Sequence, residues 1–263
     1  MIIHRRFLLG ALAGTGLAAT AVQPAAAGEE ISIFAAGAMQ KPVEALIALF
    51  ARLSPDHKVA ATYDTVGGLA DRIVAGDSPD LVFLSENALK QLAEKGKLAR
   101  NQVSPIGRTG VGLCAPLSAP QIDISTPDKL RAALLAAPSI VHADPARGAT
   151  AGTHFRKVLS EMGILDQIAP RITVVPFGGE IPGRVAKGEF ALGASQSSEI
   201  VPVKDVRYLG HLPVPYALWT TYGLASVKGL RLPDSAAAEF ALLVFTVEGD
   251  AIFKQAGFET QMR

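Results

Sequence analysis

The sequence is poor in residues and motifs on which several classes of protein depend. Cys114 is the only cysteine among 263 residues, so an intramolecular disulfide is impossible and packing must stabilise the fold. The chain has no Gly-x-Gly-x-x-Gly fingerprint and no Walker phosphate loop, which argues against dinucleotide cofactors and nucleotide hydrolysis. It also has no Gly-x-Ser-x-Gly elbow, which disfavours a serine hydrolase. The histidines lack the close spacing to cysteine or aspartate that a zinc site needs, so we expect neither a metal nor a cofactor.

The sequence also has no large excess of positive or of negative charge. Residues 1–27 contain two of the 25 basic residues and none of the 24 acidic ones, so the rest of the chain has a formal charge of −1. No basic surface for nucleic acid or for an acidic membrane is indicated. Hydrophobic residues make up 49% of the chain, which is typical of globular proteins. We therefore expect a globular monomer that binds no nucleic acid.

Residues 1–27 have the order of regions found in a secretory signal. His4, Arg5 and Arg6 precede an apolar run from Phe7 to Val22, and three alanines follow at residues 25–27. The arginine pair resembles that of a twin-arginine signal. The alternative, a membrane anchor, requires about 20 apolar residues, and the run is shorter. We expect a periplasmic protein, exported by the twin-arginine route or by another.

Three rounds of strand, turn and helix open the remaining chain. Short apolar runs at residues 31–35, 58–63 and 80–84 are typical of strands. Each is followed by a turn and then by apolar side chains at helical spacing, as in Val43 and Leu46. Strands that alternate with helices predict a parallel sheet covered on both faces, and therefore the α/β class.

A second α/β unit is predicted in the middle of the chain. Residues 103–115 form a long strand-like stretch, which we interpret as the first crossing between two lobes. Thr126 and Pro127 then indicate the start of a helix. Further strands are predicted at residues 139–143, 172–175, 190–195, 206–210 and 218–225, and closing helices at 235–246 and 250–256. The expected lobes are residues 29–110 with 215–263, and residues 111–214.

The turns after the predicted strands are the expected binding site. Ligands of open α/β sheets bind beyond the carboxyl ends of the strands. Several of these turns open directly into a helix, whose free N–H groups and positive dipole end favour an anion. The expected ligand-binding residues are Gly37, Ala38, Met39, Thr65, Val66, Gly67, Ser85, Arg147, Thr150 and Gln196.

Among these turns, residues 144–150 contain the side chains best suited to binding an anion. Arg147 is suited to a bidentate contact with a carboxylate or an oxyanion, and Thr150 can cap the helix or donate to the ligand. His154 lies one turn further along and is the expected catalytic acid or base if the protein is an isomerase. Two alternatives stay open: Arg147 as a solvated surface residue, and His154 as a hydrogen-bond partner of a neighbour.

Five segments follow the order seen in molybdate-binding proteins of ABC importers. They are FAAGAM at residues 34–39, GGLADRI at 67–73, SPDLVFLS at 78–85, DPARG at 144–148 and IFKQAGF at 252–258. The chain resembles this family over nearly all of its length after residue 27. The resemblance implies a type II periplasmic-binding fold, with mixed, mainly parallel sheets in two lobes that hinge closed on a small anion. It also implies a partner, the membrane permease of an ABC importer.

The chain differs from this family at the positions that are expected to contact the ligand. Ala38 stands where the family usually presents a ligand-binding serine, Thr65 to Gly68 replace a serine-rich turn, and Gln196 falls near the family's tyrosine. Each lost hydroxyl removes a hydrogen bond to a charged ligand worth about 1.5–3 kcal/mol. The remaining groups suit a carboxylate at least as well as molybdate.

A second resemblance implies a different activity. The segment ADPARGATAGTHF at residues 143–155, together with TVGG at 65–68, resembles a branch of the fold that includes aconitate isomerase. Such an enzyme shifts an allylic proton, for which Arg147 would clamp the anion and His154 would act as base. The expected function is therefore an exported binding protein for an organic polycarboxylate or a molybdate-like oxyanion. The alternative is an isomerase that interconverts cis- and trans-aconitate in the same cleft.

Overall fold

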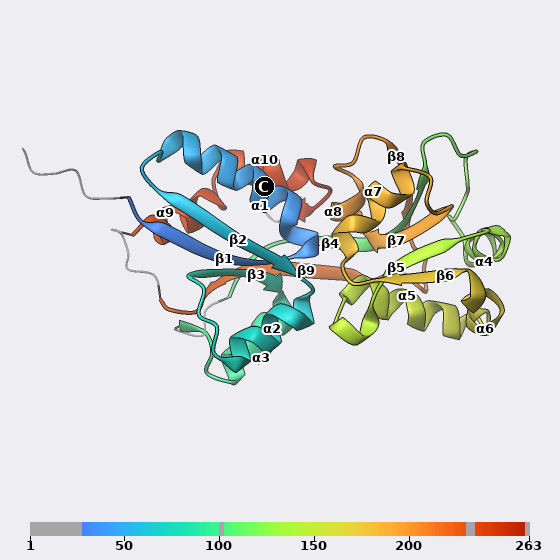
Figure 1. Ribbon diagram of the computed structural model, residues 1–263, viewed down its shortest axis with the longest axis horizontal. Helices are drawn as coiled ribbons and strands as arrows, with labels where there is room; N and C mark the ends of the chain where they lie inside the picture. Colours follow the sequence, from blue (N-terminus) through green and yellow to red (C-terminus); the bar gives the residue numbers. More distant parts are fainter. Residues whose placement is uncertain (1–27, 100–102, 230–234, 261–263) are drawn as a thin grey trace, which may run out of the picture.

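The computed structural model describes residues 28–99, 103–229 and 235–260, so the expected signal segment at 1–27 lies outside the described residues. Figure 1 shows two lobes side by side along the longest axis of the molecule, with helices on both sides of the strands. Within these described ranges, no helix combines the length and apolar character that crossing a bilayer requires.

The first lobe begins with three strand–helix pairs. They are β1 (Glu30–Ala36) and α1 (Gly37–Leu53), β2 (Lys58–Asp64) and α2 (Val66–Ala75), and β3 (Leu81–Ser85) and α3 (Glu86–Glu94). The central strand β1 is parallel to both β2 and β3. Each helix starts directly after its strand, as the turn residues predicted. The N-termini of α1, α2 and α3 therefore lie at one edge of the sheet.

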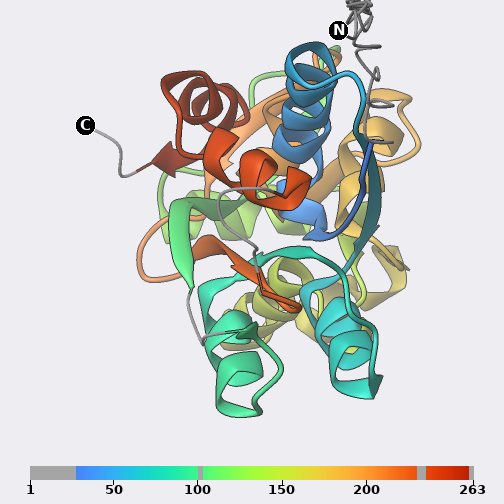
Figure 2. The ribbon, with the colours of Figure 1, turned by 90° about the vertical axis from the view of Figure 1, so that its left-hand side faces the viewer.

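The end of the chain completes this lobe. Strand β9 (Trp219–Ser226) pairs antiparallel with β3, and α9 (Ala236–Leu243), α10 (Val247–Gln255) and β10 (Glu259–Thr260) follow. Figure 2 shows α1, α9 and α10 on one face of the sheet, and α2 and α3 on the other. Because both faces are covered, every residue of β3 is buried.

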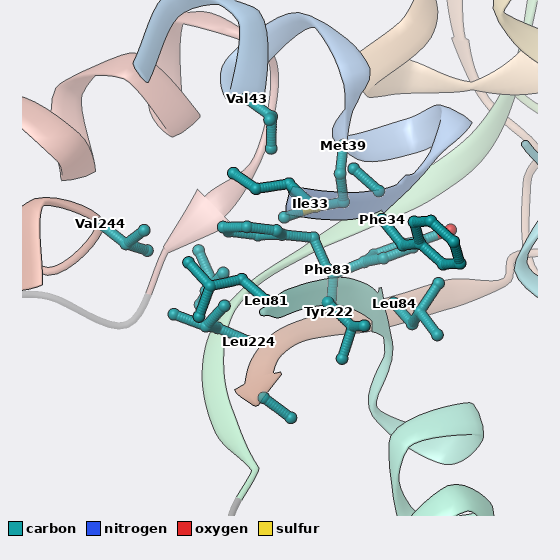
Figure 3. Packing of buried hydrophobic residues seen from close by; sticks show 14 of the residues in the cluster. Ile33, Phe34, Met39, Val43, Leu81, Phe83, Leu84, Tyr222, Leu224 and Val244 are labelled. Carbon is teal, nitrogen blue, oxygen red and sulfur yellow. The ribbon is translucent and has the colours of Figure 1, made fainter. Parts of the chain in front are cut away.

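The core of the first lobe lies on both faces of the sheet, and its larger side chains gather between the sheet and α1. Ile33 of β1 and Phe83 of β3 are fully buried there, and Val43 of α1 packs above them (Figure 3). Met39 and Tyr222 belong to the same cluster of buried side chains. Burying a side chain of this size contributes about 1.5–3 kcal/mol. This packing holds the start of α1 and the middle of β9 in fixed positions.

The second lobe repeats the α/β architecture. Its elements are β4 (Ser104–Pro116), α4 (Pro127–Ala136), β5 (Ile140–Ala143), α5 (Thr150–Glu161), α6 (Leu165–Ile168), β6 (Ile172–Val175), α7 (Ile181–Ala186), β7 (Leu192–Gln196), α8 (Ser197–Ile200) and β8 (Val206–His211). Strand β5 lies between β6 and β7 and is parallel to both. Thr126 caps α4 by accepting a hydrogen bond from the Lys129 amide, which confirms the predicted helix start.

One long strand joins the lobes. Strand β4 pairs with β9 from Ser104 to Gly110, and with β7 and β8 from Val111 to Pro116. The buried cluster of the first lobe draws on residues 31–106 and 222–258, whereas the two clusters of the second lobe fall within 111–212. We therefore propose lobe 1 as residues 29–110 with 215–263, and lobe 2 as residues 111–214.

Cys114 lies on β4 in the interior of lobe 2. Its side chain is fully buried, and that burial raises the pKa of the thiol to about 12. Cys114 is therefore a small apolar residue of the buried core. A thiol in this environment is not a nucleophile.

Candidate functional site

The carboxyl ends of four strands meet between the lobes. Strands β1 and β2 of lobe 1 and β5 and β7 of lobe 2 end at a cavity of about 30 Å³, which we call the inner cavity. Its walls are Ala36, Gly37, Ala38, Thr65, Val66 and Tyr222 from lobe 1, and Ala143, Ala149, Thr150, Ala151, Phe177, Gly178, Gln196 and Glu199 from lobe 2. Both lobes are therefore needed to form it.

Two helices direct uncapped N-termini at the inner cavity. The N-cap residues of α1 and α5 are Ala36 and Ala149, neither of which provides a side-chain acceptor. The other helices of eight or more residues in the described ranges, α2, α3, α4, α9 and α10, are all capped by a serine or threonine hydroxyl. The first amides of α1 and α5 are thus left for another acceptor, and the helix dipoles favour a negative one.

Gln196 supplies a buried polar group to the same cavity. Its side chain is 2% exposed, and neither Nε2 nor Oε1 forms a hydrogen bond of standard geometry among the described residues, although the Tyr222 hydroxyl lies close enough to interact with the amide. Leaving a buried donor or acceptor unsatisfied costs about 1–3 kcal/mol, so such groups are rare and usually pair with a ligand or an ordered water molecule. The amide can both donate and accept, which suits a carboxyl group.

Glu199 places a carboxyl group beside Gln196. The residue is 7% exposed, and its Oε2 accepts hydrogen bonds from the Ser195 hydroxyl and from the Gln196 backbone amide. Burial raises the pKa of Glu199, although these two hydrogen bonds oppose the shift. Tyr222 lies on the opposite lobe, and its pKa is raised by burial and by the charge of Glu199. The cavity therefore contains two weak acids.

A set of contacts around Arg147 joins the lobes next to the cavity, and we call it the clasp. The Arg147 guanidinium lies 3.2 and 3.3 Å from the two carboxylate oxygens of Asp64. The Thr65 hydroxyl donates to the Arg147 carbonyl, and the Gly67 amide donates to the Gly148 carbonyl at 3.3 Å. The clasp holds α2 of lobe 1 against the turn that precedes α5 of lobe 2.

A larger opening lies on the other side of the clasp. This outer cleft has a volume of about 610 Å³ and is bordered by α2, α3 and the start of β9. Gly67 and Ser85 line it, and Val66 and Thr150 line both the outer cleft and the inner cavity. A molecule that is too large for the inner cavity has space beside it.

The expected binding residues are distributed over these features. Gly37, Ala38, Thr65, Val66, Thr150 and Gln196 line the inner cavity, and Gly67 and Ser85 line the outer cleft. The hydroxyl groups of Thr65 and Ser85 also cap α2 and α3, which fixes their orientation.

Three expected residues do not line either space. Met39 is fully buried in the core of lobe 1, because the second residue after Gly37 turns toward the sheet. Arg147 is 49% exposed and directs its guanidinium to Asp64. His154 lies on α5, where its Nε2 is 2.7 Å from the carbonyl oxygen of Tyr216. The structure thus gives His154 the alternative role of a hydrogen-bond partner in the segment that joins the lobes.

Glu199 and Tyr222 were missed by the sequence analysis. Strand β7 continues to Gln196, and the short helix α8, which contains Glu199, follows. The spacing of Gln196 and Glu199 is that of a helix start with a glutamate at its third position, a signal that was available. Tyr222 lies within the strand predicted at residues 218–225, and only the structure shows that it borders the cavity. Within the described ranges, no group of three His, Cys, Asp or Glu side chains is placed to hold a metal ion.

Known proteins share this architecture. The chain is 28% identical to aconitate isomerase from Pseudomonas sp. over 192 residues, which cover 72% of this chain and 69% of the isomerase. The periplasmic molybdate-binding protein of Azotobacter vinelandii superimposes with a TM-score of 0.68 at 19% identity, over 88% of this chain and 100% of that one. The sulfate-binding protein SubI of Mycobacterium tuberculosis gives 0.61 at 20% identity, over 89% and 87%. These superpositions confirm the expected periplasmic-binding fold.

A protein-family model matches almost the whole of the chain that the structure describes. The model described as bacterial extracellular solute-binding protein matches residues 31–259, a span that includes all of lobe 2, most of lobe 1 and every wall of the inner cavity. The chain therefore belongs to the bacterial extracellular solute-binding protein family.

Proposed function

We propose that this protein captures a small organic carboxylate between its lobes and delivers it to the permease of an ABC importer. Export of the chain to the periplasm, by the signal expected at residues 1–27, and a monomeric state are parts of this proposal. The observation that carries it is Gln196, whose buried amide has neither of its polar atoms paired among the described residues and borders the inner cavity. The uncapped starts of α1 and α5 support a negatively charged ligand at the same place.

The volumes favour a carboxylate that extends beyond one anionic group. The inner cavity, at about 30 Å³, accommodates little more than a single polar group, whereas the outer cleft next to it has about 610 Å³. Val66 and Thr150 border both spaces. A polycarboxylate can place one carboxyl group against Gln196 and the rest of the molecule toward the outer cleft. A tetrahedral oxyanion has no part that would use the second space.

Calorimetric titration of the purified protein tests this proposal. We expect saturable binding of at least one of trans-aconitate, cis-aconitate, citrate or malate, and binding of molybdate and sulfate that is weaker by at least about tenfold. Sub-micromolar binding of molybdate without binding of any of the four carboxylates contradicts the choice of ligand.

A second function, aconitate isomerisation, is favoured by the Glu199–Tyr222 arrangement and by the relative named above. In that reaction a base removes a proton from the methylene carbon, the double bond moves, and a proton returns to the former vinylic carbon. A carboxyl group and a phenol on opposite walls of the inner cavity are suited to this exchange. His154 is not, because it borders neither cavity and lies against the Tyr216 carbonyl.

Proton NMR in heavy water separates the two functions. An isomerase converts trans-aconitate to the cis isomer and exchanges deuterium into the methylene group, whereas a carrier binds the ligand unchanged. If turnover occurs, we expect Glu199→Gln to reduce it by about 100-fold or more and His154→Gln to leave it within about twofold. Equal loss in both variants rules out Glu199 as the proton-transfer group.

A further inference from the structure

Glu199 has an environment that conflicts with a negative charge. Its carboxyl group is nearly fully buried, and within the described ranges no lysine, arginine or histidine forms an ion pair with it. The Ser195 hydroxyl and the Gln196 amide both donate to Oε2. Two donors compensate only part of the cost of removing a carboxylate from water.

Both lobes contribute to the burial of this group. A Cβ atom at Gly37 of lobe 1 would lie 2.6 Å from Oε1, and one at Gly178 of lobe 2 would lie 2.9 Å from either oxygen. The two glycines therefore pack their backbones directly against the carboxyl group. Gly37 of lobe 1 thereby shields Oε1 from solvent.

The groups that face Glu199 include no cationic side chain, although the positive dipole end of α1 at Gly37 offsets part of the cost of a carboxylate. They are Gly37 on α1, Gly178 before α7, Ser195 and Gln196 on β7 and Tyr222 on β9. Of these, only Tyr222 titrates, and its ionised form would add a second negative charge. Asp64 and Arg147 of the clasp neutralise each other. A bound carboxylate would bring another negative charge into a cavity of about 30 Å³.

We propose that Glu199 takes up a proton when the carboxylate ligand binds and the lobes close, so that ligand capture by this protein is coupled to proton uptake. This inference rests on the proposed function. The neutral carboxyl group becomes a donor to the ligand, and it replaces a repulsion with a hydrogen bond.

Calorimetric titration with trans-aconitate and with citrate tests the coupling. Binding is measured at about pH 7 in phosphate and in Tris, whose ionisation enthalpies differ, and the difference in heat reports the protons taken up. We expect the wild-type protein to take up about one proton and the isosteric variant Glu199→Gln to take up none. The affinity of the wild-type protein should fall by up to about tenfold per pH unit in the alkaline direction, and that of the variant should stay constant.

Each outcome has a separate meaning. Binding of either ligand without proton uptake by the wild-type protein overturns the coupling and leaves the proposed function standing. Equal proton uptake by the wild-type protein and by Glu199→Gln also overturns it, because another group must then titrate. Absence of binding by all carboxylates at every pH overturns the proposed function and the coupling together. The wild-type measurement decides the question even if the variant does not fold.

Discussion

Gly67 of lobe 1 and Gly148 of lobe 2 approach each other so closely that neither position has space for a side chain. A Cβ atom at Gly67 would lie 2.8 Å from the Gly148 Cα atom, and one at Gly148 would lie 2.6 Å from the Gly67 Cα atom. The Gly67 amide also donates to the Gly148 carbonyl. Gly148 has a φ of 71°, in the left-handed region, whereas Gly67 lies in the first turn of α2. The closed arrangement of the lobes thus depends on two glycines that meet.

The first prediction concerns Gly67→Ala. Alanine is a better helix former than glycine, so the free energy of unfolding should stay constant or rise by up to about 1 kcal/mol. The new methyl group prevents contact with Gly148, and ligand affinity should fall by about tenfold. Calorimetric titration and thermal unfolding measure the two effects.

Gly183→Ala is the matched control, because it lies in α7 and a Cβ there meets no atom within 4 Å. Similar loss of affinity in both variants contradicts the prediction.

The second prediction separates two roles of Arg147. If the guanidinium acts only through Asp64, then Arg147→Ala and Asp64→Asn should weaken ligand binding equally, by less than about 1 kcal/mol, since the pair is partly exposed. The double variant should be no weaker than either single variant. Titrations of all four proteins at low and at high salt check this. A much larger effect of Arg147→Ala than of Asp64→Asn indicates direct contact with the ligand.

The third prediction is that one substitution at Gln196 has opposite effects on the stability of the free protein and on its affinity for the ligand. Replacing a buried amide that lacks partners with an apolar side chain of similar shape removes an unsatisfied group. Gln196→Met should therefore raise the free energy of unfolding of the free protein by about 1 kcal/mol. The same change should reduce ligand affinity by about tenfold or more, because the hydrogen bonds to the ligand are lost. Denaturant unfolding measures the stability and calorimetry measures the affinity. Lower stability together with unchanged affinity refutes the role of Gln196 as a ligand-binding residue.

The fourth prediction is a pH dependence of stability. Burial raises the folded-state pKa of Glu199 above its ordinary value of 4.5, so the folded protein binds more protons than the unfolded chain in the range above 4.5. The stabilisation from the neutral carboxyl group is complete below that value and is lost as the pH rises through the folded-state pKa. Glu199→Gln should therefore be more stable than the wild type at neutral pH, and the difference should vanish near pH 4.5. Urea unfolding across this range measures it.

Much of the fold follows from the order of apolar runs and turns. The predicted strand at 172–175 has the observed bounds, the strand at 31–35 is one residue shorter than β1 at each end, and the strand at 58–63 is one residue shorter than β2 at one end. These elements have strong local signals, namely β-branched runs followed by small turn residues. Helix α8 was missed because its four residues are too few for a helical period to appear.

The candidate site was predicted less completely than the fold. Gly37 and Thr65, which follow strands, line the inner cavity because chain direction alone places them at one edge of a sheet. Arg147 and His154 were expected at the ligand on the strength of their chemistry, but the partners they contact, Asp64 and the Tyr216 carbonyl, are distant in sequence. The burial of Glu199 depends on Gly37 and Gly178, and no local pattern could indicate that encounter.

The burial of Cys114 has a practical consequence for studying how the lobes move. With its thiol inside lobe 2 and its pKa raised to about 12, the native cysteine stays unreactive toward maleimide dyes at neutral pH. A single new cysteine introduced on the surface of each lobe can then be labelled selectively. Cys114 therefore does not need to be replaced before single-molecule recordings of the opening and closing of the lobes.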